Sequence, residues 1–122
     1  MTVEQMLTTE QRVQLLETMM RMNIFEENLL RLFDQGKIAG FHHAGRGQEG
    51  VQAGAIAALR KDDYLLYAHR GVGYEIAKGV PVSKVYGDFL STMEGTTRGK
   101  GAGIVHIAVS YTHLTLPTIY SV

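Results

Sequence analysis

Cysteine and tryptophan are absent from this chain of 122 residues, and only two prolines occur. Without cysteine, the chain forms no disulfide, holds no zinc through thiolates and has no cysteine nucleophile. Twelve basic side chains balance twelve acidic ones, so no net charge attracts nucleic acid or an anionic membrane. The composition is that of one small globular domain, in which any site for an anion has to be local.

Long apolar runs are also missing. The longest uninterrupted ones, such as residues 55–59, are far shorter than the ~20 residues that a membrane-spanning helix needs. Residues 1–6 lack the basic segment and apolar core of a secretory signal. We therefore expect a cytoplasmic protein that does not bind a membrane.

A long amphipathic helix is predicted from about Thr9 to Gln35. Thr8 and Gln11 have the spacing of a capping box, and Gly36 can take the left-handed conformation that ends a helix. Apolar residues recur at three- and four-residue steps, as expected for one core-facing side: Val13, Leu16, Met20, Phe25, Leu29, Leu32 and Phe33. Further apolar residues widen this stripe, which is consistent either with a core helix or with a second contact to another subunit.

A second helix is predicted over residues 47–59, and it contains Gly50 and Gly54. A glycine inside a helix costs ~1 kcal/mol relative to alanine, so the pair suggests a buried helix closely approached by another backbone. The following patterns predict an extended or strand segment at 64–67, a helix at 71–78 ending at Gly79, a helix from Pro81 to about Glu94, and a flexible basic loop at 95–103.

Four histidines invite interpretation as metal ligands: His42, His43, His69 and His106. Their spacing does not favour this, because adjacent histidines point in different directions and no helical pair at i, i+4 occurs. Structural histidines with satisfied hydrogen bonds are the ordinary alternative. We predict no metal ligands among them.

A phosphate site is a second interpretation of the same region. Residues 45–47 form an approachable glycine turn before a helix, and backbone N–H groups at a helix start bind anions. Arg70 would supply a permanent positive charge, and His43 and His69 would add hydrogen bonds. An ordinary ion pair for Arg70 remains open at this point.

The order of several short motifs resembles one family. They are Phe25-Glu26, Gly36-Lys37-Ile38-Ala39-Gly40-Phe41-His42-His43, Gly47-Gln48-Glu49, Asp62-Asp63-Tyr64, Ala68-His69-Arg70 and Gly99-Lys100-Gly101 with Gly103 and His106. From about Thr9 to Ala108 the chain is similar to the amino-terminal part of the α subunit of thiamine-diphosphate-dependent 2-oxo acid dehydrogenases. These are the E1 components of the pyruvate, branched-chain and acetoin dehydrogenase complexes.

The resemblance implies a fold and a set of partners. The fold would be an incomplete α/β thiamin-diphosphate-binding fold, mostly helical in the part present. Its partners would be an E1 β subunit, in a heterotetramer, and a lipoyl-bearing E2. The cofactor, thiamine diphosphate, would be held through Mg2+, whose ligands lie in family segments that this sequence does not contain.

Site residues follow from the resemblance position by position. His43 matches a catalytic histidine near the diphosphate and the substrate, and Arg70 matches an arginine that contacts the diphosphate. His69 stands beside it, where the family often has tyrosine, so His43, His69 and Arg70 are the expected cofactor-binding residues. Val72 replaces a second histidine found in many members, so the proton-handling role of that position is not carried over.

Residues 109–122 do not resemble the family. They resemble translated adapter sequence, so we interpret residues 1–108 as the family part and the tail as an artefact of a truncated or chimeric gene. The parent enzyme would decarboxylate a 2-oxo acid or cleave acetoin and pass the acyl group to lipoamide, whereas this piece alone would be inactive. A non-catalytic helical interaction module, a genuine short paralogue and a transketolase-like enzyme are the alternatives.

Overall fold

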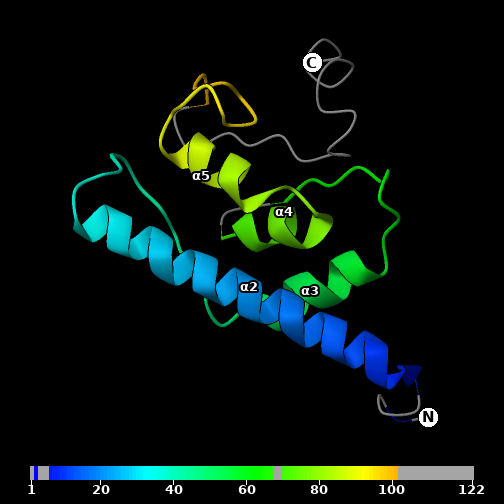
Figure 1. Ribbon diagram of the computed structural model, residues 1–122. Helices are drawn as coiled ribbons and strands as arrows, with labels where there is room; N and C mark the ends of the chain where they lie inside the picture. The colour runs from blue at the N-terminus through cyan, green and yellow to red at the C-terminus, as the bar shows by residue number, and fades with distance from the viewer. Residues whose placement is uncertain (1, 3–5, 68–69, 102–122) are drawn as a thin grey trace.

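The computed structural model describes residues 2, 6–67 and 70–101 as one group of helices. Those helices are α2 (Thr9–Asp34), α3 (Glu49–Ala57), α4 (Val72–Lys78) and α5 (Val82–Phe89), and no strand forms among the described residues. In Figure 1 the long α2 runs diagonally, and α3, α4 and α5 lie along one side of it. The prediction that this part is mostly helical is confirmed. His69, His106 and the tail lie outside the described residues.

Helix α2 begins and ends as the sequence predicts. The Thr8 hydroxyl accepts a hydrogen bond from the Gln11 N–H at 3.2 Å, and the Thr8 N–H donates to the Gln11 side chain at 2.8 Å. This is the expected capping box. After Asp34 and Gln35 the backbone turns left-handed at Gly36, with φ +68°. Both boundaries are therefore set by local chemistry.

One side of α2 forms the core. Met22, Phe25 and Leu29 are almost fully buried against α3, α4 and α5. The ring of Phe25 lies 4.4 Å from that of Tyr86 and 6.4 Å from that of Phe89, so aromatic packing joins α2 to α5. The core also includes Ile38, Ala53, Val72, Ile76, Val80 and Val85.

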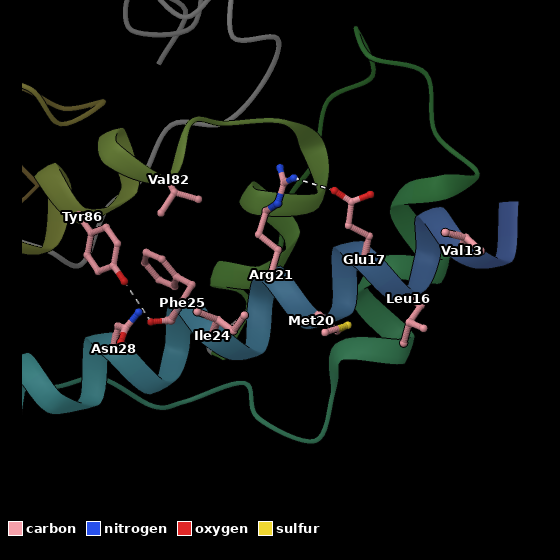
Figure 2. Close-up of a pocket in the computed structure, with 10 residues that line it drawn as sticks. All are labelled: Val13, Leu16, Glu17, Met20, Arg21, Ile24, Phe25, Asn28, Val82 and Tyr86. Atoms are coloured by element: carbon pink, nitrogen blue, oxygen red, sulfur yellow. Dashed lines mark hydrogen bonds and ion pairs between the residues drawn. The ribbon is translucent and has the colours of Figure 1, made fainter. Parts of the chain in front are cut away.

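The opposite side of α2 is open. Val13, Leu16, Met20 and Ile24 are each more than half exposed. They line an apolar groove of about 610 Å³ that Val82 and Tyr86 close on the α5 side (Figure 2). The prediction that Val13, Leu16 and Met20 face the core is wrong. The side of the helix that faces the core carries Met19 and Met22 instead. The wide apolar stripe does divide into two faces.

Helix α3 differs from its prediction. It spans Glu49–Ala57 and buries only Gln52, Ala53 and Ile56. A side chain on Gly54 would meet nothing within 4 Å, and one on Gly50 would meet only the Met19 methyl at 3.8 Å. The expected close approach of another backbone is therefore absent at both glycines, and the expected burial holds for one side of the helix only.

Helices α4 and α5 follow the predicted signals at three of their four ends. Gly79 caps α4 with φ +98°, and Pro81 is the N-cap of α5. Helix α5 stops at Phe89 rather than near Glu94, because the Thr92 N–H turns back to the Gly87 carbonyl at 2.9 Å. The segment 64–67 is extended without belonging to a sheet.

A buried lysine fixes the end of α4. Lys78, only 8% exposed, donates to the carbonyl oxygens of Arg60 and Lys61 at 2.5 and 2.9 Å. These bonds tie α4 to the turn after α3, and they satisfy the ammonium group away from water. Among the described residues, no helix has the length and apolar composition of a membrane span.

Candidate functional site

A buried carboxylate on α2 organises the segment that carries the two adjacent histidines. Glu26 is 3% exposed. Its Oε2 lies 2.6 Å from His42 Nε2, and its Oε1 accepts the Gly45 N–H at 2.9 Å. Because a carboxylate only accepts, His42 Nε2 is the donor in this pair. One side chain therefore fixes the chain on both sides of His43 and Ala44.

His42 is a structural histidine. Its side chain is 6% exposed, stacked on Phe33 with the ring centroids 5.9 Å apart, and packed edge-on against Phe89 at 5.1 Å. Its neighbour His43 is exposed. The described residues contain no group of three or more His, Asp or Glu side chains placed to hold a metal ion. The pair of histidines is thus split between the core and the surface.

The glycine turn and Arg70 meet in space. A Cβ added to Gly45 would lie 2.5 Å from the Arg70 carbonyl oxygen, a distance that real Cβ atoms essentially never show. The same oxygen accepts a hydrogen bond from Gln52 Nε2 at 2.7 Å, and Gln52 is 2% exposed. Arg70 itself is exposed, with φ +66°. Two segments that the sequence predicted to converge are therefore in contact through their backbones.

The segment that leads to Arg70 is anchored to α4. The Tyr67 hydroxyl donates to the carboxylate of Glu75, which is fully buried. Burial, and then the charge of Glu75, raise the pKa of Tyr67 well above its usual range, so the phenol stays protonated. The Tyr67 and Tyr74 rings also pack, with centroids 5.6 Å apart. The chain is thus held at two points here: Tyr67 is bound to Glu75, and the carbonyl of Arg70 is bound to Gln52.

A second carboxylate occupies the start of α3. Glu49 accepts the Gly47 N–H at 2.8 Å and the Asn23 side-chain amide at 3.0 Å. The hydrogen bond from Asn23 is the largest cause that lowers the pKa of Glu49, and partial burial works against it. A negative charge at this helix start also suits the helix dipole.

The predicted role of the glycine turn as a free phosphate cradle is therefore wrong for two of its amides. The Gly45 N–H is directed to Glu26 and the Gly47 N–H to Glu49. The physical reason is that nearby carboxylates satisfy the same donors that an anionic ligand would use. The side chains near this turn that are exposed to solvent include those of His43, Arg46 and Arg70.

Sequence reasoning missed Glu26 and Gln52 as site-building residues. The signal for Glu26 was present, since an acidic residue lies among the buried positions 22, 25 and 29 of α2 and must find partners there. No comparable signal marked Gln52, because a glutamine in a helix is ordinary on either face. His69 lies outside the described residues, so its predicted role stays a prediction.

Comparison with known proteins gives one consistent match. The model of the family described as dehydrogenase E1 component matches residues 17–117. A subunit alpha of an acetoin:2,6-dichlorophenolindophenol oxidoreductase from Bacillus subtilis is 35% identical over 102 residues. Two pyruvate dehydrogenase E1 component alpha subunits, a chloroplastic one from rice (Oryza sativa subsp. japonica) and one from Porphyra purpurea, are 33% and 34% identical over 100 and 101 residues.

The matches cover most of this chain but a small share of each relative. They include 84%, 82% and 83% of the chain, and they span 30%, 23% and 29% of the three relatives. The chain therefore corresponds to less than a third of their length. Among solved structures, none matches this chain significantly. The family match ends at residue 117, inside the segment 109–122 that was interpreted as a non-family tail, and that interpretation stays a prediction.

Proposed function

We propose a function from one premise, which is that the chain belongs to the dehydrogenase E1 component family. It forms part of the α subunit of a thiamine-diphosphate-dependent enzyme that acts on a 2-oxo acid or on acetoin. Its partners are an E1 β subunit, in a heterotetramer, and a lipoyl-bearing E2. The described helices are one portion of an α/β thiamin-diphosphate-binding fold.

The observation that carries the proposal is the contact between the glycine turn and Arg70. The turn follows His43 after one intervening residue, Ala44, and the contact at Gly45 brings this segment to the backbone of Arg70. Both side chains are exposed, so they can reach a ligand outside the core. A guanidinium keeps its charge at every physiological pH and can bind phosphate oxygens in pairs. This donor set fits an anionic group such as a diphosphate.

The roles of the chain's own residues follow from that fit. Arg70 would neutralise part of the diphosphate charge, and His43 would donate a hydrogen bond beside it, with His69 as a third proposed contact. When bound, thiamine diphosphate supplies the carbon nucleophile of the reaction, and the protein supplies binding and orientation. For Mg2+ we assign no ligand among the described residues, which hold no suitable group.

The test is the affinity of the chain for thiamine diphosphate in the presence of Mg2+, measured by isothermal titration calorimetry. Arg70→Ala is expected to weaken binding by about tenfold or more, because a charge-assisted contact is lost. His43→Ala is expected to weaken it less. Arg31→Ala is the matched control, since Arg31 is exposed on α2 and pairs with Glu27 at 2.8 Å. Equal affinities for the parent chain, the Arg70 variant and the control would contradict the proposal.

A second candidate function is a non-catalytic interaction module, and the open face of α2 favours it. The groove beside Leu16, Met20 and Ile24 leaves apolar side chains in water (Figure 2). In this alternative Met20→Lys would abolish assembly with a co-expressed E1 β subunit, while Arg70→Ala would change neither assembly nor cofactor affinity. Loss of cofactor affinity on Arg70→Ala, with assembly intact, favours the enzyme instead.

A further inference from the structure

We infer that Glu26 and Gln52 are positioning residues, which hold His43 and Arg70 in the relative placement that binds the diphosphate. Neither side chain needs to touch the ligand. The inference rests on the proposed function, and it deepens that function by naming the buried groups through which the two exposed ones act.

Glu26 acts on the His43 side. Its two oxygens bind partners on either side of His43, namely the His42 ring at 2.6 Å and the Gly45 amide at 2.9 Å. Because both partners are held by one buried carboxylate, the short stretch between them has little freedom. The exposed imidazole of His43 projects from a backbone that is fixed at both ends.

Gln52 acts on the Arg70 side. Its Nε2 donates to the Arg70 carbonyl at 2.7 Å, and its Oε1 fills the space beside Gly73, where a Cβ would lie 1.8 Å away. It is the amide of Gln52, on α3, that fixes the backbone of Arg70 just before α4 begins. The left-handed backbone of Arg70, with φ +66°, is unfavourable for a residue with a Cβ and needs such support.

The two positioning residues are also coupled to each other. A Cβ added to Gly45 would lie 3.1 Å from Gln52 Nε2, 3.4 Å from Glu26 Oε1 and 2.5 Å from the Arg70 carbonyl oxygen. Gly45 is therefore the point at which both supports meet. Displacing the side chain of Glu26 or of Gln52 changes the separation of His43 from Arg70. A diphosphate could then no longer contact both residues at once.

The first measurement is amide hydrogen exchange by NMR on the full chain, and it needs no ligand. In Glu26→Ala the Gly45 amide loses its acceptor, so its exchange should accelerate by about tenfold or more. In Glu26→Gln the side-chain oxygen can still accept from Gly45, so protection there should be retained. Glu27→Ala is the control, because Glu27 is the neighbouring glutamate on α2 and its partner is the exposed Arg31.

The second measurement is thiamine diphosphate affinity with Mg2+, in a double-mutant cycle. Glu26→Ala and Gln52→Ala should each weaken binding by about tenfold, and combining either with Arg70→Ala should add little, because the contact they position is already gone. Rescue of affinity in Glu26→Gln separates positioning from a general loss of folding. Losses that simply add to that of Arg70→Ala would overturn the inference.

The two proposals fail in different ways. If Arg70→Ala and His43→Ala leave the affinity unchanged, the proposed cofactor site is wrong, whatever happens at Gly45. If those variants weaken binding but Glu26→Ala and Gln52→Ala bind like the Glu27→Ala control, the site stands and the positioning roles are wrong. Unchanged exchange at Gly45 in Glu26→Ala would also overturn the role of Glu26.

Discussion

Two buried carboxylates in this chain each hold a loop, but they do so over different distances. Asp88 at the end of α5 is 1% exposed and accepts from the Thr96 hydroxyl at 2.5 Å and the Thr97 amide at 3.0 Å. Glu26, in the C-terminal half of α2, instead binds His42 and Gly45, which are 16 and 19 residues away along the chain.

The difference shows what each carboxylate is for. The two partners of Asp88, Thr96 and Thr97, are adjacent to each other in the sequence. Its hydrogen bonds therefore close one loop that follows its own helix. The partners of Glu26 flank His43 and Ala44, so its bonds leave an exposed side chain between two fixed points. A carboxylate that binds two neighbouring donors stabilises a loop. One that binds donors two or more residues apart can also hold the side chain between them in a fixed position at the surface.

The largest effect on stability is expected at the local carboxylate. Asp88→Ala leaves the Thr96 hydroxyl and the Thr97 amide without this acceptor in a partly buried setting. The free energy of unfolding should fall by about 3 kcal/mol, measured by urea denaturation. Asp62→Ala, which removes the same carboxylate from an exposed position, is the control and should change it little. Similar midpoints for the two variants would contradict the role given to Asp88.

A smaller loss is expected where the Glu26 loop meets Arg70. Gly45→Ala puts a methyl group 2.5 Å from the Arg70 carbonyl oxygen, so the backbone has to move. We expect the free energy of unfolding to fall by about 2 kcal/mol, with displaced NMR signals for Gln52 and Arg70. An unshifted Arg70 amide signal would show that the two segments are not in contact.

A substitution at Gly54 is expected to stabilise the fold rather than destabilise it. This glycine lies within α3, and an added Cβ would meet nothing within 4 Å. Gly54→Ala should therefore raise the free energy of unfolding by about 0.5–1 kcal/mol, because alanine is the better helix former. It also serves as the matched glycine control for Gly45→Ala. A destabilised variant would mean that a neighbouring backbone does approach α3 after all.

The smallest effect concerns pH at the start of α3. The hydrogen bond from Asn23 lowers the pKa of Glu49 below its ordinary value of 4.5. A carboxylate with a lowered pKa contributes stability that is fully present above pH 4.5 and is lost as the pH falls through its folded-state pKa. The contribution is small because Glu49 stays partly exposed to solvent, which screens its interactions. Asn23→Ala should raise the Glu49 pKa in a carbon-13 carboxyl titration, and an unmoved titration curve would exclude the bond.

Much of the helical fold could be predicted because its ends depend on local signals. The capping box at Thr8, the left-handed Gly79 and the position of Pro81 each act within a few residues, and all three hold in the structure. The facing of α2 could not be predicted in the same way. Helix α2 is apolar on two sides, and only the packing of the helices α3, α4 and α5 against it decides which side is buried.

The membership of the candidate site stays a prediction, whereas the way in which its segments meet can be compared with the structure. His43 and Arg70 were recognised by resemblance, and the segments that carry them do meet at Gly45. The backbone amides assigned to phosphate are instead directed to Glu26 and Glu49. Competition between an internal carboxylate and an external anion depends on tertiary geometry, and residue types alone do not decide it.

Lys78 gives the chain a built-in chemical reporter. Its amine is shielded and bonded to the carbonyls of Arg60 and Lys61, whereas Lys37, Lys61 and Lys100 are exposed. An amine-acylating reagent should therefore modify those three well before Lys78. Once acylated, Lys78 could no longer return to its two carbonyls, so each labelling event would trap a molecule in which α4 had separated from the end of α3. The acylation rate of Lys78 would therefore measure how often α4 separates from the turn after α3.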